Sequence, residues 1–579
     1  MSEGDDLQPR QTLGIGVTGH RLERLGDIDL AELSATVVQV FAAIETATSD
    51  VTVEATRLIT GLAEGADMIA AHAGLTRGWL LDAVLPFARD EFARDFAEGA
   101  ERTEYQDALS SASAVFELPG DRAHDGAAYE RVGRVVLAQS DVLVAVWDGG
   151  AGRGRGGAAQ IVAEAVLAGI PVIHIDPAAA HPPRLLWDRL EEHDLGQQTV
   201  DTVPRAGLER LPVLIAHLLA APSEAAERAM LDRFTSGVVE RERWFAFAYP
   251  WLLRSMARGG KAPVSEPPAA PPETCFSPVL ARIVTPRFVS ADRTGSALAR
   301  LFRSGYVTNF TFAALAVILS LMGLVLPPAL KPLLIASEVV VIGAILLVTR
   351  AGNRAQWHRR WLDHRHLAER LRVLTIGAQL GDLDLRAEAS AQRGWVGWYA
   401  RATARQIGLP TVRVDANYLE CVRGALTHLI DDQIGYLRGD AARMHRLEHR
   451  LHKLGGALFI TTAAVCVLIL VFKLAAAFDP ETFEHVAKPV GLAATIISAA
   501  LPAIGAAIYG IRMQGDLAGT SERSAGLAAQ LVTLKTVIAA DALDFDTLTR
   551  RTRRAADLLT RDLATWLHTY HARPLTLPG

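Results

Sequence analysis

Long apolar stretches occupy four places in the second half of the chain. They cover residues 307–326, 333–348, 456–472 and 490–511, and they form two pairs, each with a connecting loop. At 1.5 Å per residue, helices of this length approach the ~30 Å thickness of a bilayer core. Buried core helices are the alternative, which fits the second stretch best because it is shorter and contains Glu338. The pattern predicts two transmembrane hairpins.

The charges that flank these stretches predict their orientation. Basic residues precede the first and third stretches and follow the second and fourth, whereas the connecting loops contain few of them. Because cytoplasmic flanks are rich in Lys and Arg, both termini and all large segments are expected in the cytoplasm. The first ten residues are polar and acidic, which predicts no signal peptide. We therefore expect a multi-pass protein of the inner (cell) membrane.

Short apolar runs alternate with helical patterns in the first half. The predicted strands are residues 13–19, 57–60, 79–85, 114–118, 141–147 and 169–175. Strands that are apolar throughout are typical of parallel sheets covered on both faces. The predicted fold is an α/β doubly wound parallel sheet, followed by an α-helical membrane domain with two hairpins and long cytoplasmic helices.

These patterns also predict the domain boundaries. Residues 1–222 form the α/β domain and 223–258 a helical connector, in which the aromatic segment 244–253 is expected on the membrane face, on a neighbouring subunit or against the α/β domain. Residues 259–278 are a Pro-rich linker. The two hairpin modules then cover residues 279–412 and 413–579.

An internal repeat relates the two hairpin modules. The segment from Arg354 to Arg365 matches the segment from Arg512 to Arg523 in its Arg-x-Gln motif and in its spacing. The predicted unit is a basic helix, a membrane hairpin and then cytoplasmic amphipathic helices. Chance similarity between helices rich in Ala, Leu and Arg is the alternative.

Composition limits the class of protein. The chain has 579 residues and a mean hydropathy of +0.19 beside 21% charged residues, which argues against a purely soluble enzyme. Its 59 Lys and Arg against 64 Asp and Glu exclude a whole-chain nucleic-acid binder. Three cysteines cannot form a disulfide framework, which indicates a reducing compartment for the soluble parts. His358, His364 and His366 lack ligand spacing, so no metal site is predicted.

Three loops of the α/β domain contain the candidate chemistry. Residues 16–21, 61–67 and 148–158 each follow a strand and precede a helix, at the edge where open parallel sheets bind ligands. Their small residues allow close approach of a phosphate, although a flexible surface loop is the alternative for the third. The arginines that suit a phosphate here are Arg21, Arg153 and Arg155. No GxGxxG with its distant acidic residue and no P-loop is present, which argues against both of those sites.

The motifs GVTGHR, GLAEGAD, YERVGRVVLAQSDVLVAVWDG and RGGAA follow one another between residues 13 and 177. In these motifs the chain resembles the SLOG superfamily, the Rossmann-like nucleotide-binding domains that include the LOG phosphoribohydrolases. The resemblance implies a nucleotide-derived ligand and no other cofactor. The ligand contacts that it implies are Thr18, Gly19, His20, Arg21, Glu64, Gly65, Asp148, Gly149, Gly156 and Gly157. Just upstream of the last strand in these motifs, Tyr129, Glu130 and Arg131 are expected on a helix that faces the same cleft.

One departure from the family pattern concerns catalysis. Hydrolytic LOG enzymes carry PGGxGTxxE, in which the Glu takes part in glycosidic cleavage. Here residues 155–160 are RGGAAQ, and Glu164 falls one position too late. The resemblance therefore implies a sensor rather than a hydrolase, with no catalytic residue assigned.

The hairpins resemble SLATT domains, the two-transmembrane effectors fused to SLOG domains in bacterial conflict systems. Together the resemblances imply a nucleotide-gated effector in anti-phage defence, whose oligomeric hairpins form a pore or disrupt the inner membrane. The implied partners are a nucleotide-derived second messenger, the lipid bilayer and further copies of the chain, with no nucleic acid. Glu338 is the candidate pore residue, and pairing with Lys331 or snorkelling is the alternative. A membrane-anchored nucleotide N-glycosidase of LOG type is the alternative function, and a transporter is disfavoured because no inverted repeat is present.

Overall fold

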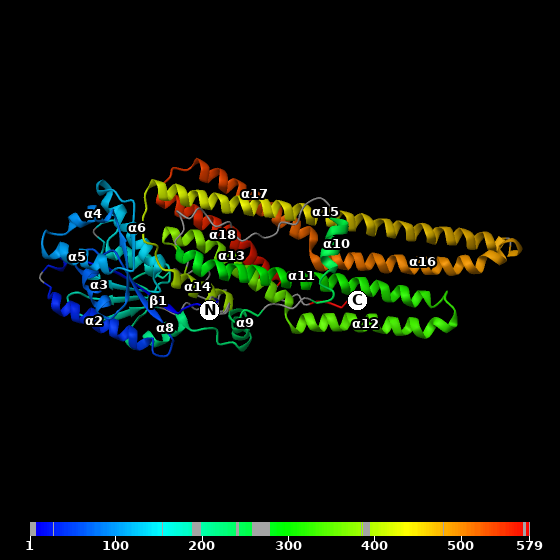
Figure 1. Ribbon diagram of the computed structural model, residues 1–579, viewed down its shortest axis with the longest axis horizontal. Coiled ribbons are helices and arrows are strands. Elements are labelled where there is room, and N and C mark those ends of the chain that lie inside the picture. The colour runs from blue at the N-terminus through cyan, green and yellow to red at the C-terminus, as the bar shows by residue number, and fades with distance from the viewer. Residues whose placement is uncertain are drawn as a thin grey trace.

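An α/β domain lies at one end of an elongated molecule, and long helices extend from it to the other end (Figure 1). The computed structural model describes residues 7–26, 28–152, 154–187, 198–238, 243–257, 278–383, 385, 394–478, 480–570 and 575–577, with the backbone alone for 480–490 and 561–570. Residues 258–277, which include nearly all of the predicted Pro-rich linker, lie outside this part.

The six strands that the apolar runs predict are all present and parallel. They are β1 (Thr12–Gly19), β2 (Ala55–Thr60), β3 (Leu80–Leu85), β4 (Ala114–Glu117), β5 (Val142–Val146) and β6 (Val172–Ile175). The sheet order is β8-β7-β6-β5-β1-β2-β3-β4-β9, so the strand order reverses between β1 and β5. Such a reversal opens a crevice at the carboxyl ends of the central strands.

The prediction of a purely parallel sheet is wrong at one edge. β7 (Arg184–Leu186) pairs antiparallel with β6, and β8 (Arg205–Ala206) pairs antiparallel with β7. These strands are only three and two residues long, so they give no periodicity from which a sequence could reveal them. The observed sheet is mixed and mostly parallel.

Helices cover both faces of the sheet. On one face α2 (Leu30–Ala47), α3 (Ala66–Thr76), α5 (Ala100–Ser111) and α8 (Leu211–Leu219) share one apolar core with the strands. On the other face lie α6 (Asp125–Gln139) and α7 (Ala158–Leu167). The short helices α1 (Leu22–Leu25) and α4 (Arg89–Phe92) follow β1 and β3. Helices on both faces explain why the parallel strands are apolar throughout.

The second half of the described chain is almost entirely helical. α9 (Ala225–Thr235) and α10 (Ala248–Met256) lie in the predicted helical connector. The remaining helices are α11 (Pro278–Met322), α12 (Lys331–Arg354), α13 (Trp357–Gly377), α14 (Trp395–Ile407), α15 (Ala416–Phe478), α16 (Pro480–Gly515), α17 (Leu517–Ala540) and α18 (Phe545–Tyr570). The third predicted span is therefore only part of a much longer helix, and so is the first up to Met322, where α11 ends four residues before the predicted boundary.

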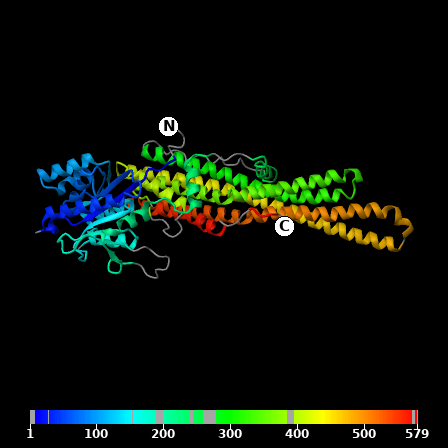
Figure 2. The ribbon, with the colours of Figure 1, turned by 90° about the horizontal axis from the view of Figure 1, so that it is seen from below.

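The two helical series follow the same order. α11 packs against α12 and α13, and α15 packs in the same way against α16 and α17. A residue in the left-handed conformation separates the helices in each series: Gln356, with φ 49°, between α12 and α13, and Asp516, with φ 43°, between α16 and α17. The α11–α12 and α15–α16 pairs lie side by side and point away from the sheet (Figures 1 and 2). This order is what the predicted repeat requires.

Four of these helices, α11, α12, α15 and α16, contain stretches long and apolar enough to cross a membrane by length and composition. Their large apolar side chains are widely exposed, such as Val340 at 70% and Phe459 at 76%. Exposed apolar surface on this scale marks contact with lipid or with another protein. α2 meets the same criterion but buries Leu33, Val37 and Phe41 against the sheet.

The α/β domain and the helical half share one core. One continuous cluster of buried apolar side chains joins α6 and α7 to α15, α17 and α18, and it includes Leu380 and Leu409. A two-residue strand from the helical half, β9 (Val412–Arg413), extends the sheet beside β4. Arg405 of α14 reaches Asp141 at 2.9 Å, and both side chains are almost fully buried. The sheet and the helices therefore form one packed body.

Two details of the helical half bear on expectations from the sequence. The aromatic segment 244–253 packs against α11 and α15, where Phe245, Tyr249 and Leu252 are buried, and not against the α/β domain. Cys421 on α15 is disulfide-bonded, although three cysteines indicated reduced thiols, while Cys466 is free.

Candidate functional site

The loops that follow β1 and β5 lie together at the carboxyl edge of the sheet. Thr18 and Gly19 are in register with Ala145 and Val146 of the neighbouring strand. Directly after these pairs, the backbone N–H of Asp148, two residues beyond Val146, donates a hydrogen bond to Nε2 of His20 at 3.1 Å. The structure therefore brings these predicted site residues together at the crevice.

Asp148 is held as a carboxylate at this edge. Burial raises its pKa, but the Gly150 N–H, the Arg24 guanidinium and His20 outweigh this effect and hold the pKa at about 2. Nη2 of Arg24 lies 2.6 Å from the carboxylate. The loop after β5 thus presents a paired negative charge toward the crevice.

Three of the predicted glycines are required by close packing inside the protein. A Cβ on Gly19 would lie 2.4 Å from Cβ of Ala66, and one on Gly65 would lie 2.8 Å from the carbonyl oxygen of His20. Gly156, at φ +81°, packs against the backbone of α6, and its N–H donates to Oε1 of Gln160 at 2.8 Å. Gly149 and Gly157 have no such close contact in the described structure. The backbone at Gly19, Gly65 and Gly156 therefore packs against other parts of the protein.

A cleft of about 350 Å³ opens beside these loops. It contains three residues singled out from the sequence, Arg21, Glu64 and Tyr129. The guanidinium of Arg21 lies 4.3 Å above the ring of Tyr129, whose hydroxyl donates to Asp95 at 2.7 Å. Its other lining residues, which the sequence analysis missed, are Glu23, Asp95, Arg122 and Asp125.

The cleft carries more negative than positive charge. Its lining includes four carboxylates and two guanidiniums. Arg122 is already paired with Asp95 at 2.7 Å, whereas Arg21 is 43% exposed and lies 3.8 Å from the same carboxylate. Burial and the nearby Glu101 raise the pKa of Glu64. The lining suits a ligand with many hydrogen-bond donors and a single anionic group on Arg21.

A sequence signal for the missed residues existed. Asp95 follows β3, and Arg122 and Asp125 follow β4. Because ligands bind at the carboxyl ends of the strands in an open parallel sheet, the position of these loops after β3 and β4 makes them candidates from the sequence alone.

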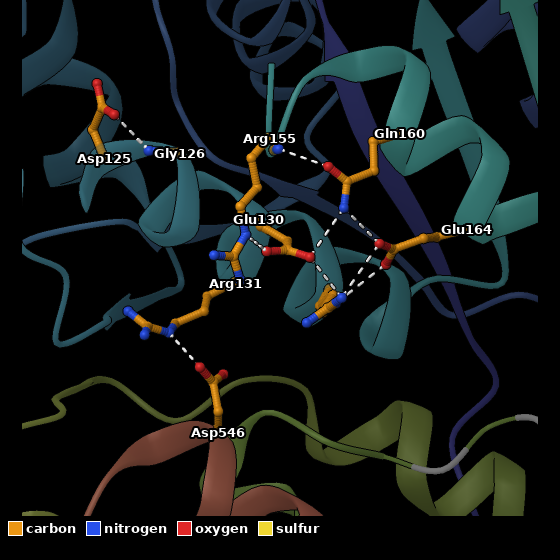
Figure 3. Close-up of polar contacts among 10 residues, drawn as sticks. Asp125, Gly126, Glu130, Arg131, Arg155, Gln160, Glu164 and Asp546 are labelled. Carbon is orange, nitrogen blue, oxygen red and sulfur yellow. Dashed lines mark hydrogen bonds and ion pairs between the residues drawn. The ribbon is translucent and has the colours of Figure 1, made fainter. Parts of the chain in front are cut away.

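The carboxylates of Glu130 and Glu164 form a separate network between α6 and α7 (Figure 3). Glu130 pairs with Arg155 and with Arg134, and Gln160 donates to both carboxylates, at 3.0 and 2.8 Å. Burial raises the pKa of Glu130, but these arginines and Gln160 lower it by more, so the pKa lies below its ordinary value. Neither carboxylate lines the cleft.

Arg131 extends from α6 toward the helical half. Its Nε donates to Asp546 of α18 at 2.9 Å (Figure 3). Within the same helix, Asp125 and Tyr129 line the cleft. One helix therefore contacts both the cleft and the helices beyond.

Two predicted residues lie apart from this site. Glu338 is half-buried on α12, and no ion pair joins it to Lys331 in the described structure. Arg153 lies outside the described residues.

Asp67 is a buried acid beneath the second loop. Desolvation raises its pKa to about 6, against hydrogen bonds from the Ala63 N–H and Thr60. Between about pH 4 and 6 the folded chain keeps this proton while the unfolded chain loses it, so the contribution of Asp67 to stability falls as pH rises through this range and then stays lower.

We predict that Asp67→Asn removes this loss. Above pH 6 the variant should gain about 3 kcal/mol over the wild type, the equivalent of about two pKa units, and below pH 4 the two should be equally stable. Thermal unfolding of the full chain in detergent from pH 3.5 to 7.5 measures the difference. If the stabilities of the variant and the wild type changed with pH in the same way, the pKa of Asp67 in the folded protein would not be raised and the prediction would be wrong.

The fold and the site define a protein with a mostly parallel α/β domain joined to helices apolar enough to cross a membrane. No known family model matches the chain, and no curated protein matches it either. In the described part of the chain, no group of three or more His, Cys, Asp or Glu side chains is placed to hold a metal ion.

Proposed function

We propose that the protein is a nucleotide-gated membrane effector, in which the cleft of the α/β domain senses the ligand and the apolar helix pairs act on the bilayer. The observation that carries this proposal is the dual contact of α6. Asp125 and Tyr129 line the cleft, and Arg131 is paired with Asp546 of α18. A ligand that shifts α6 would therefore act directly on the helical half.

The cleft supports a particular class of nucleotide. Ribose hydroxyls and base amines would donate to Glu64 and Asp95, and one phosphate would pair with Arg21. A polyphosphate would meet the four carboxylates of the lining, so the proposed ligand has few phosphates. This chemistry agrees with the resemblance to SLOG domains.

The helix pairs support the membrane part of the proposal. Their exposed apolar side chains suit hydrocarbon, and the two tips point away from the sheet (Figure 2). Trp244, Phe247 and Trp251 are exposed at 62–65% near the base of the pairs, and Trp244 stacks on Phe312 of α11. Aromatic side chains prefer the headgroup level of a bilayer. The basic residues that flank the apolar stretches favour α/β domains in the cytoplasm, and an oligomer is proposed because four spans per chain enclose little of a pore.

Flux measurements on the full chain in liposomes test the proposal. One nucleotide in a panel of mono- and dinucleotides should open or disrupt the vesicles, and Arg21→Ala should require roughly 10–100-fold more of it, since one charge-assisted contact is lost. Arg102→Ala, which removes a partly buried arginine of α5 that does not line the cleft, is the matched control. Glu338→Gln tests the pore role, which unchanged selectivity and conductance would exclude.

Two results would overturn the proposal. One is flux that no nucleotide alters, and the other is an equal response of Arg21→Ala and Arg102→Ala. Gating also requires that the ligand bind the open state more tightly than the closed state.

A nucleotide N-glycosidase is the second candidate, and the raised pKa of Glu64 in the cleft favours it. Glu164, the nearest counterpart of the family's catalytic carboxylate, is bound to Arg134 outside the cleft. Release of free base by the full chain, abolished in Glu64→Gln and retained in Glu164→Gln, would establish the enzyme.

A further inference from the structure

A second cavity, of about 390 Å³, lies in the helical half near the base of the two helix pairs. Helices α10, α11, α13, α15 and α17 all contribute to its lining. It includes Arg365 and Arg523, the two arginines that the sequence repeat places in equivalent positions. Both modules therefore present the same residue to one space.

Four guanidiniums face this cavity, from Arg300, Arg303, Arg365 and Arg523. Arg303 lies 4.9 Å from the ring centroid of Trp361 and 5.3 Å from that of Tyr249. Arg365 lies in the same way 5.4 Å from the ring of Tyr436. Stacked guanidiniums are held in place with their N–H groups directed outward from the rings, a geometry that suits anions.

The carboxylates of the cavity compensate only part of this charge. Asp440 is paired with Arg443 at 3.2 Å, and Asp516 with Arg523 at 2.8 Å. Arg365 is itself paired with Glu369, outside the lining, at 2.8 Å. Asp292 is the third carboxylate of the lining. Among the described residues, Arg303 has neither an ion pair nor a hydrogen bond; the rings of Tyr249 and Trp361 lie beside it, and the charge of Asp440 acts on it from further away.

The position of the cavity is close to the apolar part of the molecule. Tyr306 lines it, and the first apolar stretch begins at residue 307. Tyr249 and Pro250 of α10 close one side, and the same helix exposes Trp251. Figure 1 shows α10 across the long helices, well away from the sheet.

We propose that this cavity is a binding site for a phosphate-bearing anion, in which Arg303 is the principal ligand and Arg300, Arg365 and Arg523 complete the positive field. The anion is either the headgroup of an acidic phospholipid or a soluble phosphate, since both offer the same oxygens to guanidiniums. The site is separate from the cleft of the α/β domain and does not depend on what that cleft binds.

Two arms of one experiment distinguish the sources. The full chain is placed in phosphatidylcholine nanodiscs, and its thermal unfolding is followed either with added pyrophosphate or with phosphatidylglycerol replacing part of the lipid. Binding to the folded state raises the unfolding temperature in the arm that contains the true ligand. Arg303→Gln should weaken the apparent affinity by roughly tenfold or more, whereas Arg303→Lys should retain part of it.

The matched control is Arg293→Gln, an exposed arginine on the same helix that does not line the cavity. A saturable shift in the pyrophosphate arm identifies soluble phosphate, and one in the phosphatidylglycerol arm identifies lipid. The proposal is overturned if neither anion shifts the wild type, or if Arg303→Gln and Arg293→Gln respond alike. Native mass spectrometry of the wild type for retained phosphate or acidic lipid gives the same decision if Arg303→Gln does not fold.

Discussion

Arg405→Ala should destabilise the protein by about 3–5 kcal/mol, because it leaves the carboxylate of Asp141 buried without its counter-charge. The guanidinium of Arg405 donates from Nε to both oxygens of Asp141, at 2.9 and 3.0 Å, and also reaches the carbonyl oxygen of Leu218. Asp141 in turn accepts from the Gly14 N–H at 3.0 Å, so the loss reaches the centre of the sheet.

Thermal unfolding of the full chain in detergent measures this effect. Arg423→Ala is the matched control, because it removes an arginine from a surface pair with Glu420 and should cost less than about 1 kcal/mol. Asp141→Asn added to Arg405→Ala should recover part of the loss, since it removes the stranded charge and keeps an acceptor for Gly14. Equal costs for the two single alanine variants would mean that Arg405 does not join the sheet to the helices.

Val467→Arg should prevent stable insertion of the α15–α16 pair. Val467 is 61% exposed near the middle of the apolar part of α15, so the substitution removes little packing within one chain. A basic side chain near the centre of a bilayer costs about 2.5–3.5 kcal/mol. The share of protein that resists carbonate extraction from membranes should therefore fall strongly.

Gly424→Arg is the control for this substitution. It adds the same side chain to the same helix, at an exposed position with nothing within 4 Å of the new Cβ. Its extraction should match that of the wild type. If the two arginine variants were extracted equally, the exposed apolar side chains of α15 would have to face another protein rather than lipid.

The sequence predicted the central strands well because their burial on both faces leaves a continuous apolar run. It could not predict β9, in which Val412 pairs with Phe116, because two residues give no periodicity and their partner is far away along the chain. The same limit applies to Arg405 and Asp141. Nothing local to either residue shows that the other neutralises it.

Only part of the candidate site could be predicted from the sequence. Arg21, Glu64 and Tyr129 follow from motifs, and the fold brings them to one cleft. Gly65 and Gly156 illustrate the ambiguity of glycine, since close packing against the protein's own backbone needs the same residue as close approach to a phosphate. Asp95 and Arg122 belong to loops without a recognisable motif.

The position of β9 also has a consequence for the order of events during synthesis. The edge of β4 stays open until residue 413 has left the ribosome, nearly 300 residues after β4 itself. At roughly 5–20 residues per second, this interval lasts about 15–60 s, and α11 and α12 emerge within it. An open strand edge invites pairing with other chains. The α11–α12 pair therefore leaves the ribosome before β9 can cover the edge of β4. A pause in translation between residues 354 and 412 prolongs this exposure and should increase aggregation of the nascent chain.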